Sequence, residues 1–402
     1  MKSGWQTKTL GELYQIGSSK RVLKSQWESS GVPFYRGREI TRLAMDGYVD
    51  NQLFISERHF AELSRQSGVP RVNDILITAI GTIGNTYIVR KNDRFYFKDA
   101  SVLWMKRSSD VDSEFIRYWL MSYLFFEQLD KGNGATVDTL TIQKLQNVKL
   151  HIPTSEEQKR IVSILDESFE AIEKAKENAE RNLQNANELF ESYLKSVFVH
   201  LGEKCGKEKF GEVCTFVRGP FGGSLKKAIF KKDGYAVYEQ QHAINNQFVN
   251  IRYFIDENKF KEMKRFELHP GELIMSCSGT MGKVAIVPDE IKRGVINQAL
   301  LKLAPSKRII NVFLKYWMES QSFQDSLKEY SQGAAIKNVA SVKVLKSIKI
   351  PLPALSTQQS IVAKLDELSE QSIRLESIYM QKLADLAELK QSLLSKAFAG
   401  GL

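Results

Sequence analysis

Residues suited to contact a polyanion are gathered in short segments of this 402-residue chain. The clearest segment is 218–227, where glycines and a serine stand between Arg218 and the pair Lys226-Lys227. Glycines and small hydroxyls let backbone N–H groups approach a phosphate, and the cations can pair with it. Phe221 in the same segment could insert against a base, although a place in the core is the favoured interpretation. The chemistry indicated is binding of nucleic acid.

Side chains that can bind phosphates or base edges occur in both halves of the chain. An apolar run at 235–238 precedes two glutamines and a histidine, whose side chains could face adenine edges. The candidate DNA-binding residues of the first half are Ser18, Ser19, Lys20, Arg21, Arg36, Arg38, Thr78, Thr82, Asn133 and Thr136. Those of the second half are Arg218, Ser224, Lys226, Lys227, Gln240, Gln241, His242, Ser276, Ser278, Thr280, Asn297, Gln298 and Gln332. The alternative for each is an ordinary turn or a solvated loop.

The motifs that covalent or nucleotide chemistry needs are missing from the sequence. There is no G-x-x-x-x-G-K-[ST] loop, no G-x-G-x-x-G, and no Pro-Pro of the kind that amino-methyltransferases use to hold a target amine. The five histidines are scattered without metal-ligand spacing. Glu388-Leu389-Lys390 resembles the Glu-x-Lys of metal-dependent nucleases, but it falls in a predicted coiled-coil helix. We expect no catalytic residue and no metal site in this chain.

The three cysteines, Cys205, Cys214 and Cys277, show no metal-type spacing and predict free thiols in a reducing compartment. No apolar run is long enough for a membrane span, and the first residues do not resemble a signal peptide. We therefore expect a cytoplasmic protein with no membrane partner.

The chain contains an internal repeat with an offset of about 200 residues. Residues 152–167 and 352–367 match at seven of sixteen positions, among them a proline, a glutamine and the ending Leu-Asp-Glu. Other anchors also recur, such as Tyr118-Trp119 with Tyr316-Trp317. The pairs Gly81/Gly84 and Gly279/Gly282 recur too, and a shared structural turn is favoured over a reading role for them. Between the anchors the two copies differ freely, which indicates one scaffold used twice.

Each copy begins with a globular part of about 150 residues. Short strands are predicted at 74–78, 86–89, 272–276 and 284–287, and helices at 113–129 and 311–327. A long helix follows, with Thr154/Ser155 and Ser356/Thr357 as expected N-caps. From Leu165 to Val197 apolar residues recur every four and three positions, broken only by Lys176, which is typical of a coiled coil.

The second long helix has a less regular apolar seam, which runs from Leu365 through Leu375 to Ala397. Ser369, Ser372 and Glu376 fall where a strict continuation needs apolar residues, so the register is open. The two helices can pair antiparallel with each other, or each can pair with another chain. The expected fold is α+β: two similar globular domains joined by two long antiparallel coiled-coil helices, with an internal pseudo-two-fold repeat. The expected domains are residues 1–154, a central helix at 155–203, residues 204–355, and a C-terminal helix at 356–402.

The net charge of +10 is divided unevenly along the chain. Residues 1–154 and 201–355 carry +5 and +10, whereas the helical segments 155–200 and 356–402 carry −4 and −1. A surplus kept only for solubility has no reason to avoid long exposed helices. The partition predicts two DNA-binding heads on a spacer that does not bind phosphate.

Together these features resemble the specificity (S) subunit of type I restriction-modification enzymes. The resemblance covers essentially the whole chain: two variable domains, two similar helices, and the doubled helix entry Pro-x-x-x-x-Gln-x-x-Ile-Val-x-x-Leu-Asp-Glu, which starts at Pro153 and Pro353. It implies a bipartite double-stranded DNA target, with one half read by each domain and the gap set by the helices. The subunit itself is non-catalytic.

The resemblance also implies partners. Two methyltransferase (M) subunits would dock on the helices and supply S-adenosylmethionine and adenine-N6 methylation. Two motor-nuclease (R) subunits would add ATP- and Mg-dependent translocation and cleavage, so no cofactor is expected in this chain. Three alternatives stay open: a DNA-binding regulator that dimerises through coiled coils, a scaffold with no nucleic-acid role, and an S-like chain in a system that only methylates.

Overall fold

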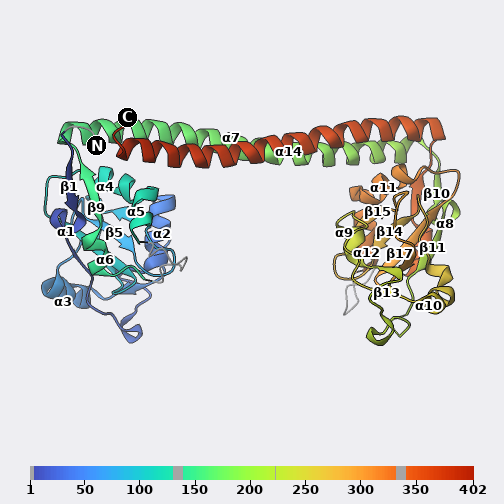
Figure 1. The fold of residues 1–402 in the computed structure, drawn as a ribbon, viewed down its shortest axis with the longest axis horizontal. Helices are drawn as coiled ribbons and strands as arrows, with labels where there is room; N and C mark the ends of the chain where they lie inside the picture. The colour runs from blue at the N-terminus through green and yellow to red at the C-terminus, as the bar shows by residue number, and fades with distance from the viewer. Residues whose placement is uncertain (1–3, 130–138, 222, 332–340) are drawn as a thin grey trace. The chain divides into compact units, whose positions relative to one another are not determined.

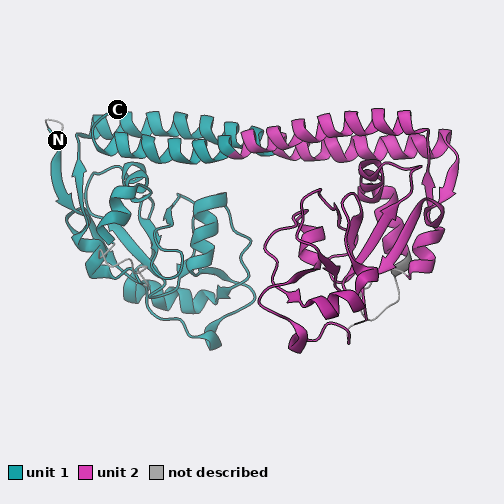
Figure 2. Ribbon diagram, turned by 45° about the vertical axis from the view of Figure 1, so that its right-hand side comes forward, with its two compact units in different colours: residues 1–180, 381–402 teal, residues 181–380 magenta. Residues whose placement is uncertain are grey.

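The computed structural model describes residues 4–129, 139–221, 223–331 and 341–402. The chain divides into two compact units: unit 1 comprises residues 1–180 and 381–402, and unit 2 comprises residues 181–380 (Figures 1 and 2). The helices α7 (Ser155–Lys204) and α14 (Leu355–Phe398) each contribute to both units. Over the described residues, no helix has the length and apolar character to cross a membrane.

Unit 1 mixes short strands with short helices before α7 begins. Its strands are β1 (Gln6–Thr9), β2 (Tyr14–Gly17), β3 (Val32–Tyr35), β4 (Phe54–Ile55), β5 (Ile75–Thr78), β6 (Thr86–Ile88), β7 (Tyr96–Phe97), β8 (Val102–Arg107) and β9 (Lys149–Ile152). Its helices are α1 (Leu10–Leu13), η1 (Lys24–Gln26), α2 (Gly37–Asp46), α3 (Glu57–Ser67), α4 (Ser113–Leu120), α5 (Tyr123–Leu129) and α6 (Ile142–Asn147).

Unit 2 repeats this series between the two long helices. Its strands are β10 (Lys207–Lys209), β11 (Cys214–Arg218), β12 (Tyr235–Tyr238), β13 (Phe254–Ile255), β14 (Leu273–Ser276), β15 (Val284–Ile286), β16 (Gly294–Ile296), β17 (Leu300–Pro305) and β18 (Lys349–Pro351). Its helices are α8 (Phe210–Val213), η2 (Lys227–Ile229), α9 (Gln240–Ile244), α10 (Glu257–Glu262), η3 (Lys264–Phe266), α11 (Asn311–Glu319), α12 (Gln321–Ser331) and α13 (Val342–Ser347).

The sheets of the two units have the same topology. Unit 1 has a four-stranded sheet ordered β2-β8-β5-β6, a three-stranded sheet β4-β3-β7 and the pair β1-β9. Unit 2 has the corresponding orders β11-β17-β14-β15, β13-β12-β16 and β10-β18. In both three-stranded sheets one pairing is antiparallel and the other parallel. This agreement confirms the α+β fold class and the internal repeat expected from the sequence.

Each globular part packs on the long helices through a single hydrophobic core. In unit 1 the core includes Ile161, Leu165 and Leu394. The ring of Phe115 lies edge-on to that of Phe398, with 5.2 Å between the ring centres. In unit 2 Leu194, Phe198 and Leu365 have the same role. The helices are therefore part of each folded unit, because burying their apolar faces removes surface from water.

The repeated helix-entry motif attaches each globular part to its helix. In unit 1 the Gln158 side chain, which is buried, accepts from the backbone N–H of Asp112 at 2.8 Å and donates to the Pro153 carbonyl at 2.9 Å. Gln358 accepts from the N–H of Ile310 and donates to the carbonyls of Pro353 and Arg308. The recurring glutamine is therefore explained by backbone groups that would otherwise be buried without a partner.

The helices expected at 113–129 and 311–327 are each broken in two. The hydroxyl of Ser122 donates to the carbonyl of Trp119 at 2.6 Å, and Ser320 makes the same bond to Trp317. Both serines are fully buried. Each hydroxyl satisfies a carbonyl at the end of the first helix, so the chain can turn before the next helix starts.

Within unit 1 the parts of α7 and α14 run antiparallel. Arg160 donates to the backbone carbonyl of Leu402 at 2.6 Å, and the ammonium of Lys390 lies 4.8 Å from the ring centre of Phe169. Higher numbers on one helix thus meet lower numbers on the other. The stack on Phe169 also agrees with our interpretation that Lys390 belongs to the helix pair rather than to a nuclease motif.

In unit 2 the contact face of α14 keeps the strict four-and-three spacing from Leu365, even where that spacing places a serine instead of an apolar residue. Ser372 is buried and its hydroxyl donates to the carbonyl of Ala186 at 2.8 Å, whereas Leu375 is 37% exposed. The expectation that Leu375 lies in the seam was wrong, because a satisfied hydroxyl facing a small alanine fits the close helix contact better. On α7 the buried positions shift from the predicted Tyr193 and Val197 to Leu194 and Phe198, which enter the core of unit 2.

The N-cap expectation holds for one long helix. The amide of Glu157 donates to the Thr154 hydroxyl at 3.4 Å, one residue before α7 begins. Helix α14 begins at Leu355, so Ser356 and Thr357 lie inside its first turn and are not its caps. The backbone N–H of Gln358 instead donates to the carbonyl of Ala354, which makes it the first helical hydrogen bond of α14.

Candidate nucleic-acid interface

Four segments that are distant in sequence meet in unit 1: the loop after β2, the start of α2, the turn after β5, and the segment between β7 and β8. The hydroxyl of Ser18 donates to the Val102 carbonyl at 3.2 Å and that of Ser19 to the Phe97 carbonyl at 2.7 Å. The amide of Ala79 donates to the carbonyl of Ser101 at 3.0 Å. These bonds fix the loops against one another.

A cavity of about 470 Å³ lies where these segments meet. It is lined by Arg36, Gly37, Arg38, Thr41, Arg42, Ile80, Thr82, Lys98 and Ser101. The lining contains four cations and three hydroxyls but no carboxylate. A cluster of this kind attracts an anion and offers donors to its oxygens.

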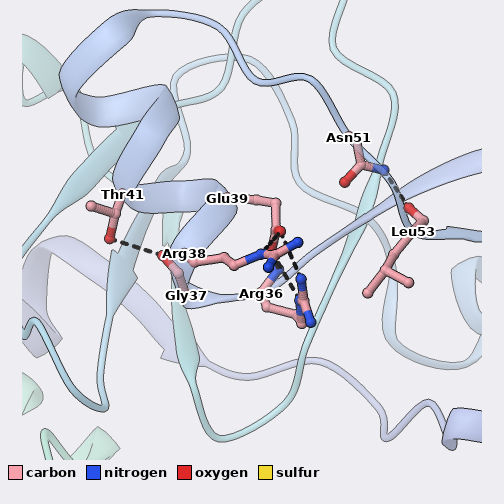
Figure 3. Close-up of polar contacts among 7 residues, drawn as sticks. All are labelled: Arg36, Gly37, Arg38, Glu39, Thr41, Asn51 and Leu53. Carbon is pink, nitrogen blue, oxygen red and sulfur yellow. Dashed lines mark hydrogen bonds and ion pairs between the residues drawn. The ribbon is translucent and has the colours of Figure 1, made fainter. Parts of the chain in front are cut away.

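Two of the cavity cations share one buried carboxylate (Figure 3). Arg36 binds Glu39 through two nitrogens, Nε to Oε2 at 3.1 Å and Nη2 to Oε1 at 2.9 Å. The Nε of Arg38 donates to Oε1 of the same carboxylate. Glu39 is 3% exposed, whereas the side chain of Arg38 is 59% exposed. Glu39 also accepts from the backbone N–H of Arg36 at 2.9 Å, which closes the first turn of α2.

The charge state of Glu39 follows from these contacts. Burial raises the pKa of the carboxyl, but the hydrogen bonds from the side chains of Arg36 and Arg38 outweigh burial and hold the pKa below its ordinary value. The carboxylate is therefore ionised at neutral pH, and it holds two guanidinium groups in fixed positions at the cavity.

Thr78 and Thr82 have different places. Thr82 is exposed and lines the cavity. Thr78 is 1% exposed; its hydroxyl donates to the Thr82 carbonyl at 2.5 Å and accepts from the Asn85 amide at 3.0 Å. Thr78 therefore does not fit the expected role of a DNA contact, because its hydroxyl is used to hold the turn.

The remaining candidates of the first half lie beside the cavity or outside the described residues. Lys20 and Arg21 are exposed, and Arg21 pairs with Asp99 at 3.1 Å, in the segment that also carries Lys98. Asn133 and Thr136 lie outside the described residues. Ser18 and Ser19 use their hydroxyls on backbone carbonyls, so they position the loop that carries the two cations.

The corresponding four segments meet again in unit 2. A Cβ on Gly219, which follows β11, would lie 1.9 Å from the Asn297 carbonyl oxygen, so the two segments touch and only glycine fits. A Cβ on Gly279 would lie 3.9 Å from the side-chain nitrogen of Gln240, at the start of α9. The backbone N–H of Asn297 donates to the carbonyl of Tyr238, just as the backbone N–H of Lys98 donates to the carbonyl of Tyr35.

The helix starts of the two units are equivalent in geometry but not in chemistry. His242 stands where unit 1 has Glu39: its Nδ1 accepts from the backbone N–H of Glu239 at 2.9 Å. Glu239 stands where unit 1 has Arg36 and pairs bidentately with Arg252 at 3.0 and 2.9 Å. The expectation that His242 contacts DNA is corrected, because this ring is 1% exposed and caps the helix.

The turn after β14 copies the turn after β5. Ser276 is fully buried and its hydroxyl accepts from the Lys283 amide at 3.0 Å, so Ser276, like Thr78, positions the turn instead of facing DNA. Thr280 is exposed and Ser278 half-buried. Gly279 and Gly282 have positive φ angles of 64° and 78°, which supports the structural-turn interpretation of both glycine pairs.

The glycine-rich segment of unit 2 lies at the surface. Lys226 and Lys227 are exposed, Arg218 and Ser224 are half-buried, and residue 222 lies outside the described residues. Phe221 is 93% exposed, so the expectation that it fills the core was wrong. The Ser224 amide donates to the Phe221 carbonyl at 2.9 Å, a turn that directs this ring away from the apolar interior.

Four other candidates of unit 2 lie at or near the start of α9. Gln240, Gln241 and Asn297 are half-buried and Gln298 is exposed. The Oδ1 of Asn297 accepts from the amide of Ala299 at 3.0 Å. Gln332 lies outside the described residues.

The sequence analysis missed four polar residues that line the cavity of unit 1: Thr41, Arg42, Lys98 and Ser101. Thr41 and Arg42 lie one turn along α2 from Arg38, and a helical spacing of three or four from that residue could have identified them. Lys98 had no local signal, because only the parallel pairing of β3 with β7 brings it to the cavity.

The described part of the chain contains no group of three or more His, Cys, Asp or Glu side chains placed to hold a metal ion. The three cysteines are free in the structure, with Cys214 and Cys277 buried and Cys205 half-buried. The chemistry that the site offers is that of donors and cations for an anionic ligand.

Comparison with known proteins identifies the class. A family model described as the type I restriction modification DNA specificity domain matches residues 2–181 and again residues 203–384. The chain therefore belongs to the family of type I restriction-modification specificity subunits and carries two copies of their domain.

Three curated relatives illustrate this membership. A putative type I restriction enzyme specificity subunit of Haemophilus influenzae is 36% identical over 168 residues, which is 40% of this chain and 40% of the relative. The EcoBI specificity subunit of Escherichia coli is 30% identical over 142 residues, 35% of this chain and 30% of the relative. The putative MjaX specificity subunit of Methanocaldococcus jannaschii is 22% identical, with 91% of this chain and 87% of the relative covered. The chain thus spans less than half the length of the first two relatives.

Two solved structures share the fold. A chain from a structural study of complex assembly and conformational transition in a type I R-M system aligns with a TM-score of 0.80 and 20% identity, covering 100% of this chain and 99% of the other. The HsdS subunit of Thermoanaerobacter tengcongensis aligns with a TM-score of 0.65 and 20% identity, covering 100% and 98%.

Proposed function

We propose that this chain reads a two-part sequence of double-stranded DNA, and that each unit reads one half. The observation that carries the proposal is that one scaffold presents different side chains at matched positions. The second helical residue is Arg38 in unit 1 and Gln241 in unit 2, and the N-terminal flanking residue is Arg36 in one and Glu239 in the other. Because base edges are distinguished by their donors and acceptors, two such surfaces would select two different sequences.

The cations supply affinity. Arg42 and Lys98 line the cavity of unit 1, and Lys226 and Lys227 are exposed at the start of η2 in unit 2. Lysine and arginine contacts to phosphates fix a protein on the duplex without selecting a sequence. The chain would perform no covalent step itself.

The long helices would carry the partners and set the gap between half-sites. Large apolar side chains of α14 are exposed in unit 2, including Ile373 and Met380, each 63% exposed, and Ile378 at 49%. Exposed apolar side chains of this size on a helix favour a protein partner. We propose that two methyltransferase subunits dock on the helices and bring S-adenosylmethionine. Two motor-nuclease subunits would complete the complex with ATP and Mg.

The test is methylation mapping at single-base resolution. DNA from cells that express this chain with its neighbouring methyltransferase is compared with DNA from cells that lack the chain. We expect an interrupted two-part motif that is methylated only when the chain is present. No difference, although the chain is folded and the methyltransferase active, would reject the proposal and favour a regulator or a scaffold.

Two variants test whether each unit reads one half-site and whether the helices set the gap between the half-sites. Exchanging residues 1–150 for the corresponding domain of another specificity subunit is expected to change one half-site and leave the other unchanged. A change in both half-sites would contradict one unit per half. Lengthening α7 and α14 by one turn each is expected to change the gap alone, and an unchanged gap would contradict the spacer role.

A further inference from the structure

We infer that Arg38 reads a guanine in the half-site of unit 1, and that Glu39 is the positioning residue that aims its guanidinium. The inference rests on the proposed function and assigns one base to one side chain. It depends on how the three charged groups at the start of α2 share their hydrogen bonds (Figure 3).

Arg36 uses most of its guanidinium nitrogens within the protein. Two of its three guanidinium nitrogens bind the Glu39 carboxylate, at 3.1 and 2.9 Å, and its side chain is only 23% exposed. The guanidinium carbon also lies 5.9 Å from the ring centre of Trp27. A side chain held in this way contributes charge to the cavity, but it has little freedom to reach a base.

Arg38 is held differently by the same carboxylate. Only its Nε donates to Glu39, so the outer edge, formed by Nη1 and Nη2, has no protein partner among the described residues. The side chain is 59% exposed and lines the cavity. Fixing Nε sets the plane of the guanidinium, and the outer edge then presents two parallel donors to a ligand.

Two parallel donors match one base edge in the major groove. Guanine presents the acceptors N7 and O6 side by side, whereas adenine presents N7 beside the N6 amino donor, which repels a guanidinium. Arg42 and Lys98 line the same cavity and could hold the adjoining phosphates. A preorganised arginine among phosphate-binding cations is therefore suited to guanine.

Unit 2 provides the contrast. Gln241 occupies the position of Arg38, as the second residue of α9, and the carboxylate that would orient an arginine is replaced by the buried ring of His242. The arrangement that favours guanine is thus confined to unit 1. The effect of changing Arg38 should appear in one half-site only.

The experiment measures DNA binding by the assembled complex of the full chain with its methyltransferase. Each guanine in the half-site of unit 1 is replaced in turn by 7-deazaguanine, which lacks the N7 acceptor. For the wild type, one replacement is expected to weaken binding by roughly five- to 150-fold. In Arg38→Gln the same replacement should cost less than about twofold, because the guanidinium that would bind N7 is already absent.

Controls separate this inference from the proposed function. Arg58→Gln changes an exposed arginine of α3 that does not line the cavity, and it should keep the full effect of 7-deazaguanine. Continued recognition of the other half-site shows that an Arg38 variant is folded. A wild type that selects no two-part motif overturns both proposals. A motif without guanine in this half-site, or an undiminished effect in Arg38→Gln, overturns the assignment of Arg38 alone.

Discussion

The hydroxyl of Tyr316 donates a hydrogen bond to Oδ1 of Asp366 at 2.6 Å, and Tyr118 makes the same bond to Asp166 in unit 1. Each bond joins the globular part of a unit to its long helix. Burial, together with the neighbouring aspartate, holds the pKa of both tyrosines well above the ordinary value. Both hydroxyls therefore stay protonated and donate throughout the pH range in which proteins bind DNA.

Removing this bond should loosen the attachment. Tyr118→Phe and Tyr316→Phe are each expected to lower the free energy of unfolding by about 0.5–1.5 kcal/mol, the net contribution of one hydrogen bond. Four of the five tryptophans lie within residues 5–119, so tryptophan fluorescence in urea follows mainly unit 1 and Tyr118→Phe. Tyr123→Phe, at a side chain that is 62% exposed, is the matched control. Equal effects in Tyr118→Phe and the control would contradict the attachment role.

The carboxylate of Glu39 gives a pH prediction. Its pKa is lowered in the folded chain, so the pairing with Arg36 and Arg38 stabilises the fold above the unfolded value, near 4.5, and this stabilisation is lost as the pH falls through the folded value. Glu39→Gln should therefore lower the free energy of unfolding by about 1–3 kcal/mol at pH 7, and by clearly less near pH 4. Urea titrations at the two pH values measure this difference. A destabilisation that does not change with pH would show that shape, not charge, matters at this position.

Gly84 gives a backbone prediction. Its φ is +96°, and an added Cβ would lie 2.8 Å from the ring of Phe126. Gly84→Ala should destabilise unit 1 by about 1–3 kcal/mol through strain and overpacking. Gly17→Ala is the control, because a Cβ there meets nothing within 4 Å. Thermal unfolding followed by tryptophan fluorescence compares the two, and equal midpoints would mean that the turn tolerates a side chain.

The buried thiols give a chemical prediction. Burial raises the pKa of Cys214 to about 12 and that of Cys277 to about 11. The thiolate is the reactive form, so both residues should resist iodoacetamide at pH 8 in the folded protein and react once urea unfolds it. Cys205, which is half-buried, should be labelled first. Mass spectrometry of the digested chain locates the label, and rapid labelling of Cys277 in the folded state would contradict the described packing.

Much of the fold could be predicted because the sequence contains two copies of it. The strands expected at 74–78 and 272–276 form within one residue of β5 and β14, since short apolar runs bounded by turn residues are local signals. The two long helices were also evident from their spacing, although the spacing left open whether they pair with each other. The breaks at Ser122 and Ser320 were missed, because a buried serine that bonds a helix carbonyl looks like any polar residue in a helical pattern.

The candidate site was less predictable. Among the predicted contact residues, Arg36, Arg38 and Thr82 line one cavity, whereas Thr78, Ser276 and His242 face inward. A hydroxyl that binds a phosphate and one that binds a backbone amide are the same residue type, so composition cannot separate them. Lys98 reaches the cavity only through the pairing of β3 with β7, a contact between residues about 60 apart.

The hydroxyls of Thr78 and Ser276 hold their turns by accepting hydrogen bonds from main-chain amides, those of Asn85 and Lys283. A bond from an amide does not depend on the side chain that the donor residue carries. The side-chain carboxamide of Asn85 and the side-chain ammonium of Lys283 can therefore occupy equivalent places while the turn keeps its shape. Mutations of the donor residues leave this main-chain bond in place, so a lineage of these chains could evolve new preferences in one half at a time while the turn keeps its shape.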